Sequence, residues 1–420
     1  MGPGVDGASS AQTMLYAAEV SAWTHLQKVF PPKRKAVSGT QQDSQPKTLR
    51  TLLRQLDEQG VTDYRRYDAV RKFLSFKARD KGIPISGSFE LTPLCNLDCR
   101  MCYVHLNKEQ MAGTQLLTVE QWKAIMQQAI DAGMMYARLT GGECLTYPGF
   151  RELYTYLHSK GVETAILSNG LLMDADMVDF LVAHPPAAVQ ITLYGASEEG
   201  YERVTGKRAF RQVLENIRRL DAAGIPLQIA VTPNEFMTDG EHVIRLLHEE
   251  GLSFAINAGL MAPREETGRK LADAALDAYV AMLKLRMRLK GRQIEPDCDP
   301  ESLPDPGSER ASAEKGVRCG AGRSGFAIDW QGRMRPCNTF PCEPVDVLAL
   351  GFPEAWKRTN HTANNYPLPA ECEGCAYKGV CKHCVAEHSA GAPAGHASPA
   401  ICAWGKRMVS EGLQILQQSK

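Results

Sequence analysis

Short apolar runs alternate with longer amphipathic segments between residues 86 and 257. The apolar runs predict six strands, which cover residues 86–91, 136–140, 162–167, 188–194, 226–232 and 252–257. The segments between them carry apolar residues at helical spacing. Strands that alternate with helices predict a parallel sheet, because each helical crossover returns the chain to the same end of the sheet.

Local signals mark where several of these helices begin and end. Thr118-x-x-Gln121 is a capping box, and Asp174 precedes another apolar helical stripe as its N-cap. Gly224 and Gly251 follow later stripes and are expected to end those helices, because glycine accepts the left-handed conformation of a C-cap.

Two further regions flank the alternating core. Helical periodicity precedes it, and a helix is expected from Asp63 to Lys81. After a long helix over residues 269–289, the chain becomes rich in Pro, Gly, Asp and Ser. We therefore expect a helical extension, a core, a linker and a C-terminal domain, at residues 1–83, 84–290, 291–317 and 318–420.

The charge balance excludes some classes of partner. Lys plus Arg and Asp plus Glu each number 48, so the net charge is zero. No bulk attraction to nucleic acid or to an anionic membrane is expected. No apolar run approaches the roughly 20 residues of a membrane span. The first residues lack the pattern of a signal peptide, so we expect a cytoplasmic location.

Thirteen cysteines gather in two regions, residues 95–144 and 298–402. Clustered cysteines in an unexported chain indicate metal binding rather than disulfides. Cys95, Cys99 and Cys102 form a C-x3-C-x2-C motif directly after the first predicted strand. Three thiolates on a four-iron cluster leave one iron open to a small chelating molecule. A zinc site is the alternative, although zinc sites more often pair C-x2-C with a second, distant pair.

This motif resembles that of the radical S-adenosylmethionine enzymes. In that family the open iron of a [4Fe-4S] cluster binds S-adenosylmethionine, and one electron cleaves it to a 5′-deoxyadenosyl radical. The resemblance implies an α/β fold, a partial (β/α)6 TIM-like barrel with its site at the carboxyl ends of the strands. It also implies an external electron donor such as flavodoxin or ferredoxin.

The resemblance extends to residues that contact S-adenosylmethionine. Gly141-Gly142-Glu143 follows the second strand and resembles the family's GGE motif, which contacts the methionine amino group. Glycines let the backbone approach a ligand, and a carboxylate can accept hydrogen bonds from an ammonium group. Cys144, where the family usually has proline, is expected to be a small loop residue. Positions that face the ribose or the methionine carboxylate in the family are matched by Ser168, Thr192 and Arg203.

The C-terminal cysteines form a second constellation. Cys319 and Cys337 stand on either side of Gly332, and a C-x2-C-x5-C-x2-C run and a last cysteine follow. This resembles the SPASM extension, an iron–sulfur domain of radical enzymes, whose pattern has one more residue in its last short gap. The segment from Phe326 to Met334 is expected to form the hairpin between the first two cysteines.

Two auxiliary [4Fe-4S] clusters are implied by this second resemblance. One would be held by Cys372, Cys375, Cys381 and Cys402. The other would be held by Cys319, Cys337 and Cys384. Its fourth ligand would be Cys342, with Cys298 as a less favoured candidate, or one of its irons would be left open to substrate. Taken alone the run suits a zinc ribbon nearly as well, but its place after a radical-enzyme core favours clusters.

Enzymes of this architecture mostly act on peptides or proteins. The first expectation is therefore a maturase that abstracts hydrogen from a ribosomally made precursor peptide and installs a thioether or another carbon-linked crosslink. The second is a formylglycine-generating enzyme of the anaerobic sulfatase-maturating type. The third, of another class, is a non-catalytic scaffold that carries clusters or zinc. The sequence singles out no catalytic acid or base.

Overall fold

The computed structural model describes residues 63–102, 104, 106, 115–257, 273–291, 316–317, 319–379, 381, 384–389 and 391–411. The expected helical extension before residue 63, most of the linker and Cys298 lie outside the described residues. Among the described helices, none is both long and apolar enough to cross a membrane.

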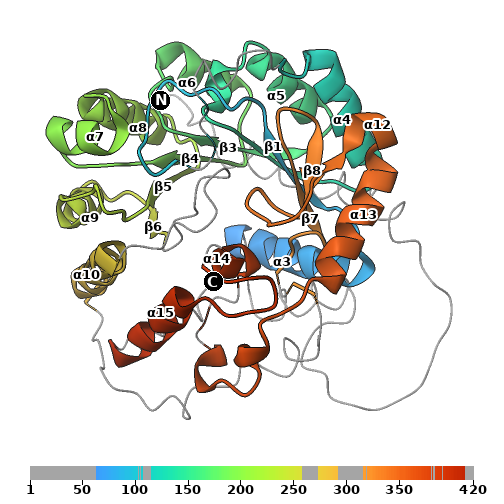
Figure 1. The fold of residues 1–420 in the computed structure, drawn as a ribbon. Coiled ribbons are helices and arrows are strands. Elements are labelled where there is room, and N and C mark those ends of the chain that lie inside the picture. The colour runs from blue at the N-terminus through green and yellow to red at the C-terminus, as the bar shows by residue number, and fades with distance from the viewer. Residues whose placement is uncertain are drawn as a thin grey trace.

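Nine described strands form one sheet in the order β6-β5-β4-β3-β2-β1-β7-β8-β9 (Figure 1). Its first six strands pair in parallel, and they are β1 Ser86–Glu90, β2 Tyr136–Thr140, β3 Glu163–Ser168, β4 Ala188–Thr192, β5 Leu227–Val231 and β6 Phe254–Ile256. Each lies where the hydrophobic pattern predicts a strand. The described sheet does not close on itself, so the prediction of an α/β partial barrel is confirmed.

Helices connect these strands along one face of the sheet (Figure 1). They are α4 Val119–Asp131, α5 Phe150–Ser159, α6 Ala175–Ala183, α7 Glu198–Thr205, α8 Phe210–Ala222 and α9 Gly240–Glu249, with a short turn η1 at Cys144–Thr146. The capping box is confirmed, since Thr118 and Gln121 each accept the other's backbone N–H. Asp174 caps α6 as predicted. The hydrophobic pattern missed α7, which begins where the Ser197 side chain accepts from the Gly200 N–H.

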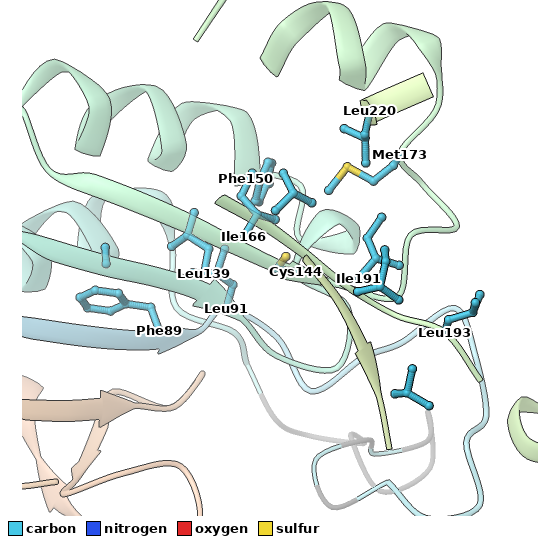
Figure 2. Packing of buried hydrophobic residues seen from close by; sticks show 14 of the residues in the cluster. Phe89, Leu91, Leu139, Cys144, Phe150, Ile166, Met173, Ile191, Leu193 and Leu220 are labelled. Carbon is cyan, nitrogen blue, oxygen red and sulfur yellow. The ribbon is translucent and has the colours of Figure 1, made fainter. Parts of the chain in front are cut away.

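The main core lies between the sheet and these helices. Side chains alternate along a strand, and Phe89, Leu139, Ile166 and Ile191 from four neighbouring strands all point to this outer face, where none is exposed (Figure 2). Phe89 meets Trp122 of α4 edge to face, with ring centroids 5.9 Å apart. Burying each such side chain contributes about 1.5–3 kcal/mol, so this face supplies most of the stability of the barrel.

The other face of the sheet, which we call the inner face, has a different chemistry. By the same alternation it carries Ser88, Glu90, Arg138, Gln190 and Gln228. Helix α3, Asp63–Lys81, lies on this side (blue in Figure 1). It buries Leu74 and Ala78 against Ile85 and Tyr136, and so covers the end of the sheet where the strands begin.

The predicted C-terminal hairpin forms and joins the barrel. β7, Gly325–Ile328, pairs in parallel with β1, and β8, Arg333–Arg335, returns antiparallel to it. Gly332, with φ of 77°, lies in the turn. The Phe326 ring packs 5.8 Å from Phe89. The expected boundary near residue 318 therefore falls between segments that share one core.

The remaining described elements are one longer helix, α10, which packs against α9 and β6, and several shorter segments. They are α10 Asp273–Leu289, β9 Val345–Asp346, α12 Val347–Leu350, α13 Phe352–Asn365, η3 Ala370–Cys372, η4 Ala376–Gly379, α14 Val385–Ser389 and α15 Pro399–Ser410. Trp356 of α13 donates its ring N–H to the Gly82 carbonyl at 2.8 Å, which ties this region to the chain just before β1.

Candidate cluster and cofactor site

Three thiols lie on the loop that leaves β1 at its carboxyl end. The backbone N–H of Leu97 donates to Cys95 Sγ at 3.4 Å, and that of Val104 donates to Cys102 Sγ at 3.5 Å. Asn169, at the end of β3, directs its side-chain amide to Cys95 Sγ at 3.6 Å. N–H groups aimed at sulfur stabilise negative charge there, as they do around iron–sulfur clusters.

Burial is the largest influence on the pKa of two of these thiols, Cys95 and Cys99. It raises the pKa of Cys95 to about 11 and that of Cys99 further, and the neighbouring thiols add to both shifts. Thiols of such high pKa give up their protons when a metal replaces them. Within the described ranges no three His, Cys, Asp or Glu side chains converge closely enough to share one metal ion. A cubane binds each thiolate to a different iron, so the three cysteines fit that group.

The two glycines after β2 hold the start of the cysteine loop. The N–H of Gly142 donates to the Thr92 carbonyl at 2.7 Å. A Cβ on Gly142 would lie 2.4 Å from the Leu94 carbonyl oxygen, and one on Gly141 would lie 2.3 Å from that of Thr92. Gly141 also has φ of 149°. Glycine is therefore needed here so that two backbone segments can touch.

Glu143 is buried within a hydrogen-bond network of its own. Its carboxylate is 1% exposed and accepts hydrogen bonds from Ser168 Oγ at 3.0 Å and from the Asn169 backbone N–H at 2.7 Å. The Leu145 N–H donates to it as well. Burial raises its pKa, whereas these bonds oppose that shift. Glu143 and Ser168 thus connect the end of β2 to the end of β3.

Sequence reasoning missed two polar side chains beside the cysteines. Asn169 Nδ2 donates to Asn96 Oδ1 at 2.7 Å. Tyr194, just past β4, lies within hydrogen-bonding reach of Cys99. Asn169 follows the predicted strand at residues 162–167 and Tyr194 ends the one at residues 188–194, and the carboxyl ends of parallel strands meet at one edge. That placement was the available signal for both.

Thr192 and Arg203 lie near the same edge. Thr192 is the half-buried last residue of β4. Arg203 on α7 donates to the Thr238 hydroxyl. The carboxyl end of α7 also holds the cysteine loop, because the Asp98 N–H donates to the Thr205 carbonyl at 2.9 Å.

Cys144 takes no part in the cysteine loop. Its thiol is buried and faces the Leu167 carbonyl at 3.4 Å. It behaves as the small loop residue that the sequence predicts.

Four C-terminal cysteines lie near one another. Burial raises the pKa of Cys337, Cys342 and Cys384. The neighbouring Cys319 adds to the shift of Cys337, and Cys337 adds to the shifts of Cys342 and Cys384. Asn338, next to Cys337, donates to Glu90 on the inner face at 2.6 Å. This contact links the second cysteine region to the first strand of the barrel.

The remaining cysteines lie around α15. Cys381 Sγ would be 3.8 Å from a Cβ on Gly405, one turn along α15 from Cys402. Cys372 ends η3, and the Cys375 N–H donates to its carbonyl at 3.4 Å.

Residues 89–247 match the family model of the radical SAM superfamily. This chain contains a radical SAM domain. Its relatives include the antilisterial bacteriocin subtilosin biosynthesis protein AlbA of Bacillus subtilis (strain 168), 28% identical over 71% of this chain and 68% of AlbA. The sporulation killing factor maturation protein SkfB of the same organism is 32% identical over 38% of each chain. The structure of Streptococcus suis SuiB bound to precursor peptide SuiA matches with a TM-score of 0.60 and 14% identity, over 94% of this chain and 89% of SuiB.

The radical SAM domain spans β1 to α9, the part of the sheet that carries the three-cysteine loop. A radical SAM domain implies S-adenosylmethionine and a [4Fe-4S] cluster, and the three-cysteine loop lies within the matched residues. The structural likeness to SuiB supports the partial-barrel fold.

Proposed function

We propose that this protein is a radical SAM enzyme that modifies a ribosomally made precursor peptide. The observation that carries the proposal is the loop of Cys95, Cys99 and Cys102, held by the ends of β2 and β3 and by α7. The names of AlbA and SkfB link related chains to peptide products. S-adenosylmethionine bound with such a cluster supplies a radical that abstracts hydrogen.

Different residues of this chain would hold the cluster and S-adenosylmethionine. The three cysteines would hold the cluster, and Asn169 and the loop amides would stabilise the charge on their sulfurs. The backbone of Gly141 and Gly142 would approach the methionine amino group, while Glu143 and Ser168 keep that backbone in place. Thr192 and Arg203 are proposed contacts to the ribose or the methionine carboxylate. An external flavodoxin or ferredoxin would deliver the electron.

Two auxiliary [4Fe-4S] clusters form part of this proposal. Cys372, Cys375, Cys381 and Cys402 would hold one. Cys319, Cys337, Cys384 and Cys342 would hold the other, and the proximity of Cys342 to Cys337 supports the fourth ligand. A completed cluster suits the uptake of an electron from the substrate better than the binding of a substrate thiolate.

The completed auxiliary cluster also favours a second candidate function. Formylglycine-generating enzymes of the sulfatase-maturating type usually complete both auxiliary clusters with cysteine. The two functions differ in their product from a cysteine peptide, since a crosslink removes two hydrogens and keeps the sulfur, whereas formylglycine formation removes two hydrogens and also replaces the sulfur with oxygen.

Mass spectrometry separates them. Reconstituted enzyme, S-adenosylmethionine and dithionite would be incubated with short cysteine-containing peptides encoded beside the gene, and with a sulfatase-type peptide. In a cysteine-containing peptide, a loss of two hydrogens with the sulfur retained supports the maturase. A loss of two hydrogens together with exchange of sulfur for oxygen supports the second candidate. Cleavage of S-adenosylmethionine without change to any peptide would contradict both.

A further inference from the structure

Arg138 is an unpaired cation on the inner face of the sheet. It lies in the middle of β2, between Ala137 and Leu139, whose side chains pack into the outer core. Among the described residues Arg138 has no hydrogen bond, ion pair or ring contact. Its side chain is exposed, yet surrounding protein lowers the pKa of its guanidinium. An exposed, unpaired guanidinium in the middle of a strand is open to a ligand on that face of the sheet.

A second cation lies beside Arg138 on the inner side of the sheet. Arg71 of α3 places its guanidinium 5.1 Å from the centre of the Tyr136 ring, and Tyr136 is two residues before Arg138 on the same face. The charge of Arg71 acts on Arg138 and adds to the lowering of its pKa. Two like charges held together without a counter-ion destabilise the fold.

The acidic side chains on this face near Arg138 are engaged elsewhere. Glu90 accepts a hydrogen bond from the Asn338 amide at 2.6 Å. Glu163 pairs in register with Tyr136 across β2 and β3. Its carboxyl group accepts the Tyr67 hydroxyl, and burial raises its pKa to about 7. Neither arginine forms an ion pair with it or with another acid in the part of the chain that the structure describes.

We propose that Arg138 and Arg71 form an anion site that binds a carboxylate of the peptide substrate. This inference rests on the proposed function. A guanidinium holds a carboxylate through two parallel hydrogen bonds, which fixes its position as well as its charge. A bound carboxylate would offset the repulsion between the two cations. The site would therefore prefer an acidic peptide, although the same repulsion destabilises the free protein.

The strand sets the distance from this site to the cofactor motif. Arg138 stands three residues before Gly141 on β2. At about 3.3 Å per residue, the two lie roughly 10 Å apart along the strand. An extended peptide spans the same distance in about three residues. The acidic residue of the substrate should therefore be about three positions from the carbon that loses hydrogen.

Binding tests this directly. The probes are two dye-labelled hexapeptides, Gly-Glu-Ser-Gly-Cys-Gly and its counterpart with Gln in place of Glu, both amidated at the C-terminus. Fluorescence anisotropy would be measured with the reconstituted full chain and S-adenosylmethionine. The wild-type protein should prefer the Glu peptide about tenfold, which is about 1.4 kcal/mol. Arg138→Gln and Arg71→Gln should each abolish that preference, whereas Arg211→Gln, a side chain 88% exposed on α8, should keep it.

Thermal unfolding gives a second readout. If the two cations repel each other, Arg138→Gln should raise Tm, whereas loss of a purely structural arginine would lower it. Equal binding of both peptides by the wild-type protein overturns the proposal, and so does a lower Tm in Arg138→Gln with the preference intact. Tighter binding of inorganic pyrophosphate than of the Glu peptide, lost in Arg138→Gln, would overturn it in favour of a phosphate ligand.

A separate assay tests the proposed function. Samples of the wild-type protein would be assayed for 5′-deoxyadenosine in the same buffer. If none forms, the proposed function is contradicted. If it forms and neither the Glu preference nor its loss in Arg138→Gln is seen, the carboxylate site alone is contradicted.

Discussion

The two faces of the sheet are built from the same strands but have different roles. Phe89 and Leu139 point outward into an apolar layer under the helices. Glu90 and Arg138, each one residue away, point to the inner face. The outer face can be explained by burial alone. The inner face and the carboxyl ends of the strands carry polar groups that cost stability, so they are where function is expected.

This difference predicts that equal chemical changes have unequal effects in the two regions. Substitution of a glycine, a hydroxyl or a carboxylate at the strand ends or on the inner face should alter the site or the pH dependence of stability. The same residue type on the outer helices should affect local stability alone.

The largest effect is expected from Gly142→Ala. Its Cβ would lie 2.4 Å from the Leu94 carbonyl, so the start of the cysteine loop must shift. We expect a loss of roughly 3 kcal/mol in unfolding free energy, at the upper end of overpacking costs. Iron bound by the catalytic loop should also be lost, as measured by iron and sulfide analysis.

Gly224→Ala is the matched control for this change. Gly224 ends α8 with φ of 69°, and nothing lies within 4 Å of a Cβ there. It should lose about 1 kcal/mol through backbone strain and keep its iron. Equal iron loss in both variants would show that the Gly142 contact is not what holds the loop.

Ser168→Ala should come next. It leaves the buried Glu143 carboxylate without its hydroxyl donor, which costs about 1–3 kcal/mol. Chemical denaturation measures the change. Ser159→Ala removes an exposed hydroxyl that donates to the Tyr156 carbonyl, so its effect should stay within about 0.5 kcal/mol. If the two variants are equally stable, the coupling of β2 to β3 through Glu143 is not important.

Glu163 on the inner face should make stability depend on pH. Burial raises its pKa to about 7, so the folded protein binds this proton more tightly than the unfolded chain does. Protonation therefore favours folding, and stability is lost as pH rises from about 4.5 to about 7. With allowance for partial exposure, we expect a loss of about 1–2 kcal/mol.

Glu163→Gln should remove this part of the pH dependence. It should also be more stable than the wild-type protein above pH 7, since Gln can still accept the Tyr67 hydroxyl. Denaturation curves at several pH values measure both effects. Parallel pH profiles for the two proteins would contradict the assignment.

The smallest effect is expected on the outer layer. Thr118→Ala removes the N-cap of α4 and should cost about 1 kcal/mol. The iron content and the cleavage of S-adenosylmethionine should not change. A drop in either would mean that the outer helices contribute to the site more directly than the comparison of the two faces allows.

The elements of the barrel could be predicted because each depends on a short stretch of sequence. The strands from β1 to β6, the capping box at Thr118 and the hairpin turn at Gly332 each depend on a few adjacent residues. The pairing of β7 with β1 could not be predicted in this way, because it joins residues more than two hundred positions apart.

The same limit applies to the site. The cysteine spacing identified the loop, and the family match supports that reading. The hydrogen bonds of the buried Glu143 carboxylate come from Ser168 and Asn169 at the end of another strand, and no sequence spacing reveals them. Arg138 passed unnoticed because its lack of a partner appears only in three dimensions.

Reductive cleavage of S-adenosylmethionine tests the central claim most directly. Wild-type protein and a Cys95/Cys99/Cys102→Ala variant would be purified without oxygen, reconstituted with iron and sulfide, and assayed with dithionite for 5′-deoxyadenosine. The account predicts steady formation by the wild-type protein and loss of at least a thousandfold in the variant, with about four fewer irons per chain. Equal formation by both proteins, or none by a wild-type protein that holds its iron, would contradict it.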